Sequence, residues 1–285
     1  MKKLSEEEKS VIEQFMVPFF HAEKRHPLFP GKAEIEVEAS LLGISVEELK
    51  TYRQNFEQNA KQGALELLKE DEIIDIIDEL PFDGEETFVA FGDSSTEDQQ
   101  GWFEIFKHLL EISFENADFK FINSGVAYNT TSEALKRLER DVILHEPDWV
   151  LVSLGTFDVQ RLNVAPQRTL LPLSETWENL NTIHEILEEQ VENHSLWVTP
   201  TPVIGELLEA NPIYEFTIDN NDIEQLRQLV TGKTGGIVDP KGKRMGDEEP
   251  KAWNYLGDGL HPSLSGHINT VREVLRTFVE IESRS

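Results

Sequence analysis

The sequence predicts an α/β fold, in which a parallel sheet is covered by helices on both faces and a smaller all-helical region precedes it. Two observations lead to this expectation. Residues 1–85 show only the apolar periodicity of helices, whereas in residues 86–285 short apolar runs alternate with helical patterns. We therefore expect residues 1–85 to pack on an α/β domain formed by residues 86–285.

The 285 residues include no cysteine, so disulfides, thiolate nucleophiles and cysteine-bound zinc are excluded.

Composition narrows the range of partners. There are 26 Lys and Arg residues against 54 Asp and Glu residues, a formal net charge of −28. Such a charge repels the phosphates of nucleic acids and anionic lipid headgroups, so we expect neither nucleic acid nor membrane as a partner. The N-terminus lacks the apolar core of a signal peptide, and no apolar run is long enough to span a bilayer. These features favour a cytoplasmic protein, whose oligomeric state they leave open.

The N-terminal region begins with a helix signal. Ser5 and Glu8 have the spacing of a capping box, and apolar residues then recur on one face. Pro27, Pro30 and Gly31 interrupt the pattern. Further helices are expected around Glu34–Leu42, Ser45–Lys61 and Gly63–Ile77. The side chains expected to need burial are Phe15, Phe19, Leu41 and Leu42.

The stretch from Ala39 to Tyr52 has the spacing of a helix-turn-helix, with Gly43 at the turn. Its second helix would present Glu47 and Glu48 to a phosphate backbone, which disfavours DNA binding. A helical hairpin that packs on the rest of the protein is the favoured interpretation, and a DNA-binding regulator is the alternative.

The second region reads as strands and helices in alternation. Strands are expected at Thr87–Phe91, Phe119–Asn123, Trp149–Leu154 and Ser195–Thr199. Helical patterns lie between them, and Ser263–Glu280 forms a closing helix. This order is typical of right-handed βαβ units. Pro240–Gly257 is expected to be a loop, as are the polar segments Asp219–Asp222 and Thr231–Gly235, which resemble calcium and phosphate loops only superficially.

Ligands of open α/β sheets bind beyond the carboxyl ends of the strands. Four polar, glycine-bearing segments fall at that edge: Gly92–Glu97, Asn123–Thr131, Gly155–Asp158 and Asp258–Ser263. A serine hydrolase needs a serine, a base and a carboxylate that orients the base. Asp258 and His261, three residues apart at a helix entrance, suit the last two roles. His267, one turn into the last helix, is expected to be structural.

At this point the residues resemble the SGNH, or GDSL-type, serine hydrolases (esterases and lipases), over residues 86–283. The blocks that carry the resemblance are Gly92-Asp93-Ser94, Asn123-Ser124-Gly125, Gly155-Thr156-Phe157-Asp158 and Asp258-Gly259-Leu260-His261. The resemblance implies a flavodoxin-like three-layer α/β/α sandwich and ester hydrolysis through an acyl-enzyme.

By this resemblance Ser94 is the nucleophile, His261 the general base and Asp258 its orienting carboxylate, with no metal and no cofactor. The oxyanion would be held by the backbone N–H groups of Ser94 and Gly125. Phe157 stands where the family has an asparagine whose side chain is the third donor, and loss of one such donor typically lowers kcat by about 10²–10³-fold.

Three explanations of Phe157 stay open. The protein is a slow esterase in which Asn129 or Gln160 supplies a donor, or a ligand-binding protein on a hydrolase scaffold, or an engineered variant. If Phe157 points into the oxyanion pocket, Phe157→Asn raises kcat. If its ring packs in the core, the substitution costs stability and leaves kcat flat or lower.

The substrate is expected to be a small ester with a short acyl chain or an acetylated sugar. The candidate substrate-binding residues are Asp93, Asn129, Trp253 and Tyr255. The two aromatic residues lie just before the Asp258 block, where they either form a wall of the site or pack in a small core.

Overall fold

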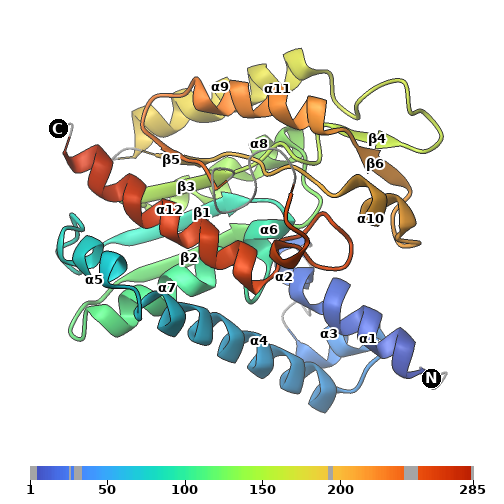
Figure 1. The fold of residues 1–285 in the computed structure, drawn as a ribbon, viewed down its shortest axis with the longest axis horizontal. Coiled ribbons are helices and arrows are strands. Elements are labelled where there is room, and N and C mark those ends of the chain that lie inside the picture. Colours follow the sequence, from blue (N-terminus) through green and yellow to red (C-terminus); the bar gives the residue numbers. More distant parts are fainter. Residues whose placement is uncertain (1–4, 26, 29–33, 192–194, 241–249, 284–285) are drawn as a thin grey trace.

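The computed structural model describes residues 5–25, 27–28, 34–191, 195–240 and 250–283. Its centre is a five-stranded parallel sheet in the order β2-β1-β3-β5-β7 (Figure 1). The strands are β1 (Thr87–Gly92), β2 (Lys120–Gly125), β3 (Trp149–Ser153), β5 (Leu196–Val198) and β7 (Gly236–Val238). This is the strand order of flavodoxin-like folds. The predicted fold class is therefore confirmed.

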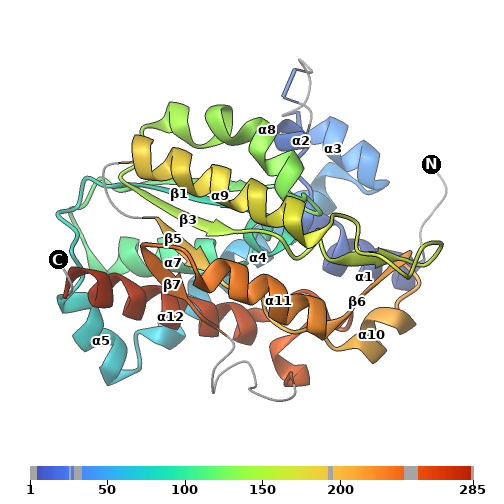
Figure 2. The ribbon, with the colours of Figure 1, turned by 90° about the horizontal axis from the view of Figure 1, so that it is seen from above.

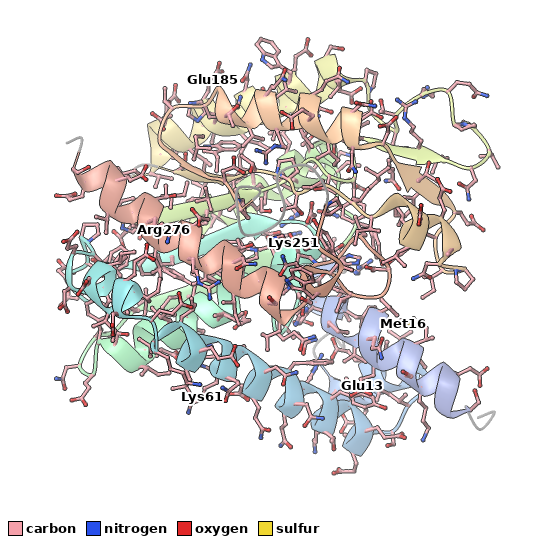
Figure 3. The ribbon with its side chains drawn as sticks, in the orientation of Figure 1. Glu13, Met16, Lys61, Glu185, Lys251 and Arg276 are labelled. Carbon is pink, nitrogen blue, oxygen red and sulfur yellow. The ribbon has the colours of Figure 1, made fainter. Side chains whose placement is uncertain are left out.

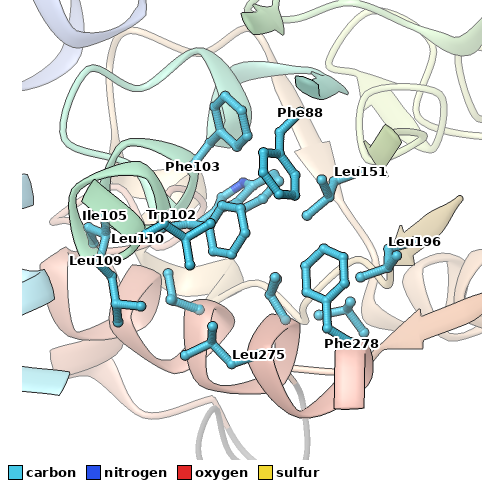
Figure 4. Close-up of a cluster of buried hydrophobic side chains, with 14 of the residues drawn as sticks. Phe88, Trp102, Phe103, Ile105, Leu109, Leu110, Leu151, Leu196, Leu275 and Phe278 are labelled. Atoms are coloured by element: carbon cyan, nitrogen blue, oxygen red, sulfur yellow. The ribbon is translucent and has the colours of Figure 1, made fainter. Parts of the chain in front are cut away.

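Alternation along the strands divides the interior into two cores. Phe88 and Ala90 of β1 point to one face of the sheet, while Val89 and Phe91 point to the other. The first face is covered by α7 (Trp102–Ser113), α12 (Leu264–Glu282) and α5 (Asp71–Asp78). The second is covered by α8 (Thr131–Asp141), α9 (Leu173–Gln190) and α11 (Asn220–Thr231). Figure 2 shows the sheet between α8 and α9 on one side and α7 and α12 on the other, and Figure 4 shows the first core.

The N-terminal region is helical, as predicted. It contains α1 (Glu6–Phe15), the 3-10 helix η1 (Val17–Phe19), α2 (Ala22–Arg25), α3 (Ile35–Leu42) and α4 (Val46–Leu67). Capping boxes start α1 and α4 at Ser5 and Ser45. A small apolar cluster lies between these helices, formed by residues such as Ile12 and Leu49.

The predicted break near residue 62 is wrong, because α4 continues to Leu67 and α5 begins at Asp71. Gly63 lies inside α4, where a Cβ would approach side-chain atoms of Ile105 to 3.1 Å. The glycine thus serves close helix packing and not chain reversal. Ala60, Ala64 and Leu67 of α4 belong to the same core as β1. Leu41, expected to be buried, is 64% exposed.

Several elements lacked a clear sequence pattern. A short antiparallel pair is formed by β4 (Gln160–Leu162) and β6 (Phe216–Ile218), and α10 (Gly205–Ala210) precedes β6. The loop expected at Asp219–Asp222 is wrong: Asp219 caps α11 and accepts a hydrogen bond from the Asn221 N–H at 2.8 Å. In the expected loop Pro240–Gly257, residues 241–249 lie outside the described part, and Ala252–Asn254 form a 3-10 helix.

Charged side chains cover both regions of the molecule, and Glu13 and Glu185 lie at its surface on opposite sides (Figure 3). Within the described residues, no helix combines the length and the apolar character needed to cross a membrane.

Candidate active site

Ser94 lies directly beyond the carboxyl end of β1, at the start of the short helix α6 (Ser94–Glu97). Asp93 caps this helix and accepts a hydrogen bond from the Ser95 N–H at 3.2 Å. Gly92 is required by space, because a Cβ there would lie 2.1 Å from Thr96 Oγ1. The tight turn leaves Ser94 fully buried, with its Oγ accepting a hydrogen bond from the Tyr128 N–H at 3.0 Å.

Asp258 and His261 form a buried pair in the loop before α12. His261 Nδ1 lies 2.6 Å from Asp258 Oδ2, and the other carboxylate oxygen accepts the backbone N–H groups of Leu260 and His261 at 3.0 Å each. Tyr214 adds a hydroxyl hydrogen bond to Oδ2 at 2.9 Å. Burial raises the pKa of a carboxyl group, but these hydrogen bonds, His261's first, outweigh it and hold the pKa of Asp258 below its usual value. The ionised carboxylate therefore fixes the proton on Nδ1 and leaves Nε2 as the free nitrogen.

Ser94 and His261 line one cavity of about 50 Å³, together with Asp93, Ser153, Phe157 and Thr199. His261 Nε2 is buried and has no hydrogen-bond partner among the described residues. Ser94 Oγ and His261 Nε2 thus belong to residues that line the same cavity, but no hydrogen bond joins the two atoms. Catalytic hydrogen bonds are often long in ligand-free enzymes and shorten when substrate binds.

Tyr128 is a site residue that sequence reasoning missed. Its φ of 63° lies in the left-handed region, which is uncommon for a residue other than glycine, and its N–H points at Ser94 Oγ. Strained backbone of this kind clusters at functional sites. A tyrosine carries no sequence signal for such a conformation, so the sequence offered no means of finding it.

The loop that holds Tyr128 is fastened from several sides. Asp158 accepts the Thr131 N–H at 2.8 Å and the Thr131 hydroxyl at 2.5 Å. Glu97 of α6 accepts the Ala127 N–H. Buried Arg137 donates to the carbonyls of Ser124 and Gly92 at 2.7 and 2.9 Å. These contacts fix the loop relative to the ends of β1 and β2, and so fix the Tyr128 N–H relative to Ser94.

Gly125 and Asn129 lie in the same loop but face other partners. The Gly125 N–H donates to Asn123 Oδ1 at 3.0 Å, and a Cβ on Gly125 would lie 2.3 Å from the Glu97 nitrogen. Asn129 Oδ1 accepts from Arg137 Nε at 2.8 Å. The structure gives Gly125 a packing role against α6 and gives Asn129 a role in holding the loop.

Phe157 lies both at the cavity and in the second core. Its side chain is 2% exposed, and its ring meets those of Tyr128 and Phe216 edge to face, with centroids 5.2 and 6.3 Å apart. Gln160, considered as a substitute donor, gives its amide to the Phe157 carbonyl at 2.8 Å. The ring is therefore a packed wall of the cavity.

Asp93, expected to bind substrate, lines the cavity and is buried. Burial raises the pKa of Asp93 to about 7, although the hydrogen bond from the Ser95 N–H and the charge of His261 act in the opposite direction. The protonation state of Asp93 therefore changes near neutral pH, in the cavity that Ser94 and His261 also line.

The remaining candidates lie away from the cavity lining. Trp253 is 68% exposed, and Tyr255 is buried, donating its hydroxyl to the Pro202 carbonyl at 2.6 Å. The structure therefore brings neither ring to the wall of this cavity. His267 accepts the Trp102 N–H at 3.1 Å and lies 3.2 Å from Asp98, which fits the structural role expected of it.

Comparisons with known proteins connect this geometry to a family. Residues 90–267 match the family model described as GDSL-like Lipase/Acylhydrolase family. The chain is 25% identical over 207 residues to an acetylxylan esterase of Geobacillus stearothermophilus, a match that covers 68% of this chain and 84% of that enzyme.

Solved structures agree on the fold. The crystal structure of an acetylxylan esterase from Geobacillus stearothermophilus superposes with a TM-score of 0.53 at 22% identity, over 68% of this chain and 94% of that one. Solved catalytic mutants of that enzyme replace a serine, an aspartate or a histidine by alanine. An α/β hydrolase from the metagenome of Lake Arreo, Spain, superposes with a TM-score of 0.55 at 20% identity, over 69% and 96% of the two chains.

Proposed function

The chain belongs to the GDSL-like lipase/acylhydrolase family and is a carboxylic ester hydrolase of that type, and on this premise we propose that it removes short acyl groups from carbohydrate esters. The observation that carries the proposal is the Asp258–His261 pair, whose free Nε2 shares a cavity with Ser94. A nucleophile, a base and an orienting carboxylate together form a catalytic triad, which supports acyl transfer through a serine ester.

In the proposed reaction, Ser94 Oγ attacks the carbonyl carbon of the ester while His261 Nε2 accepts the hydroxyl proton. The imidazolium formed is stabilised by Asp258 and then donates that proton to the leaving alcohol oxygen. Water, deprotonated by the same nitrogen, next cleaves the acyl-enzyme and releases the acid. Because Nε2 must be neutral to accept a proton, activity is expected to fall on acidification.

For the oxyanion we propose the backbone N–H groups of Ser94 and Tyr128, in place of the Gly125 N–H expected from the sequence. The Ser94 N–H lies in the first turn of α6, where a helix has no internal acceptor. The Tyr128 N–H already lies 3.0 Å from Ser94 Oγ, next to the position an attacked carbonyl oxygen would occupy. The Gly125 N–H is engaged by Asn123. With Phe157 at the third position, we propose that the site works with two donors and turns over slowly.

The size of the cavity supports an acetyl group as the acyl part. Pockets that hold drug-sized ligands measure about 300–1,000 Å³, and a single water needs about 10–15 Å³. A cavity of about 50 Å³ suits a group of a few heavy atoms. The similarity to an acetylxylan esterase supports the same choice.

The proposal is tested with p-nitrophenyl esters of increasing acyl length and with acetylated saccharides, measuring kcat/KM for each. We expect acetyl esters to be preferred, and Ser94→Ala to abolish the activity. Ser95→Ala is the matched control: this neighbouring serine lines the same cavity, and among the described residues its hydroxyl hydrogen-bonds to Asp93 at 3.3 Å. Equal turnover of acetyl and octanoyl esters would contradict the proposed acyl preference.

A further inference from the structure

The N-terminal region contributes a side chain to the site. Phe19, in η1, stacks on the imidazole of His261 with ring centroids 4.4 Å apart and planes 29° from parallel. Both rings are 2% exposed. Phe19 lies far outside residues 90–267, which match the family model. The contact therefore belongs to this chain's own N-terminal region.

The segment that bears Phe19 is fastened to the elements that hold the reacting groups. Gln99, just after α6, donates its N–H to the Pro18 carbonyl at 3.1 Å and its side-chain amide to the Val17 carbonyl at 2.8 Å. His21 Nδ1 lies 3.1 Å from Glu97 Oε1. Figure 1 shows α2 beside α6. Phe19 is consequently fixed relative to Ser94.

Arg25 fastens the same segment to the loop that holds Tyr128. Its guanidinium donates to the Phe19 carbonyl at 3.3 Å and to the Ala127 carbonyl at 3.5 Å. Val17 is fully buried in the N-terminal apolar cluster. With anchors on both sides, loss of the Phe19 ring should leave space and not draw the backbone inward.

The position of Phe19 identifies the part of the substrate that it faces. In acyl transfer the leaving alcohol oxygen must come within hydrogen-bond distance of the base nitrogen that protonates it. That nitrogen, His261 Nε2, is closed to solvent here, and Phe19 covers the face of its ring. Phe19 is absent from the lining of the 50 Å³ cavity beside Ser94. His261 lines that cavity too, so Phe19 packs on the imidazole from outside the cavity.

We propose that Phe19 is a specificity-determining residue that restricts the alcohol part of the ester. Its ring takes up space beside Nε2 that a bulky alcohol would need, so small carbohydrate alcohols are accepted and the further sugar rings of an oligosaccharide are disfavoured. This proposal rests on the proposed ester hydrolysis at Ser94. It adds that the N-terminal region selects among the alcohol parts of the substrate.

The test holds the acyl group constant and varies the alcohol. We would measure kcat/KM for p-nitrophenyl acetate and for an acetylated xylo-oligosaccharide with the full-length chain, Phe19→Ala and Phe19→Leu. Phe20→Ala is the matched control, since Phe20 packs against the N-terminal cluster. One extra or missing methylene group in a hydrophobic pocket changes kcat/KM by about 10–200-fold. We expect Phe19→Ala to raise the oligosaccharide-to-p-nitrophenyl ratio by about tenfold or more, Phe19→Leu to raise it less, and the control to leave it unchanged.

A merely structural role for Phe19 would lower both rates together and leave their ratio unchanged, so an unchanged ratio in folded, active variants overturns this proposal alone. If Phe19→Ala fails to fold, the ratio measured for Phe19→Leu decides in the same way. Failure of the proposed function would look different: the full-length chain and every variant would hydrolyse neither acetate, and both proposals would fall together.

Discussion

The α/β region and the N-terminal helices bring different kinds of residue to the same site. In the α/β region, Ser94, Asp258 and His261 follow strands or precede a helix, and short polar blocks mark them in the sequence. In the N-terminal region, Phe19 is one apolar residue of an amphipathic pattern. The comparison shows that a residue that reacts must be of a particular type, which marks it in the sequence. A residue that only lines the site needs no more than a suitable size and position.

The largest expected effect is the loss of kcat when one of the reacting residues is replaced. Ser94→Ala, His261→Ala and Asp258→Ala should each lower kcat by roughly 10⁴-fold or more, and the double variant Ser94→Ala/His261→Ala should be no worse than either single one. The three groups act as a unit, so their losses do not add. Steady-state kinetics on variants with unchanged circular dichroism checks this, and multiplicative losses would contradict it.

A second experiment tests whether the two regions are separable. Deleting residues 1–80 would uncover α7 and α12, because Ala60, Ala64 and Leu67 of α4 share their core. It would also remove Glu70, whose carboxylate accepts a hydrogen bond from Arg272 Nε at 2.9 Å. We expect an aggregating product by size-exclusion chromatography, whereas a monomeric, stable and equally active fragment would show that the α/β region stands alone.

Substitution of Phe157 tests whether its ring only packs as a wall of the cavity or occupies the place of an oxyanion donor. Its ring packs against Tyr128 and Phe216, so Phe157→Asn should cost several kcal/mol of stability, in the range of about 3–5 kcal/mol seen when a buried phenylalanine is truncated. We expect a lower melting temperature and an unchanged or lower kcat. Phe157→Leu, which stays apolar, should lose less stability. A rise in kcat of about 10²-fold for Phe157→Asn would instead show that the ring occupies the place of a third donor.

The smallest expected effect concerns Asp93. Its pKa is raised from 3.8 to about 7 by burial, so the folded chain keeps a proton that the unfolded chain releases. The contribution of Asp93 to the free energy of unfolding of the wild type is therefore fully present below pH 3.8 and decreases as the pH rises toward 7. Asparagine cannot ionise and still caps α6.

We therefore expect the melting temperature of Asp93→Asn, relative to wild type, to increase between about pH 5 and pH 8. Asp118→Asn, at an exposed aspartate, is the control for the same change in net charge. A difference for Asp93→Asn that is independent of pH would contradict the raised pKa.

Much of the fold and the reacting residues could be predicted because their physical requirements constrain sequence. Buried strands need apolar runs, and Asp258 and His261 need a short spacing for their hydrogen bond. The Tyr128 N–H is a backbone group that any residue supplies, and Trp253 was placed from sequence proximity to Asp258, although the chain turns its ring to solvent. Strands of three residues such as β7 are too short for a periodic pattern.

The central claim, that Ser94 is a nucleophile activated by His261, is tested most directly by covalent labelling. The full-length chain would be treated with a fluorophosphonate probe, digested, and the modified residue identified by mass spectrometry, beside Ser94→Ala, Ser95→Ala and His261→Ala. We predict labelling at Ser94 in the wild type and in Ser95→Ala, and none in Ser94→Ala or His261→Ala. An unlabelled wild type, or a label that persists in Ser94→Ala, would contradict the claim.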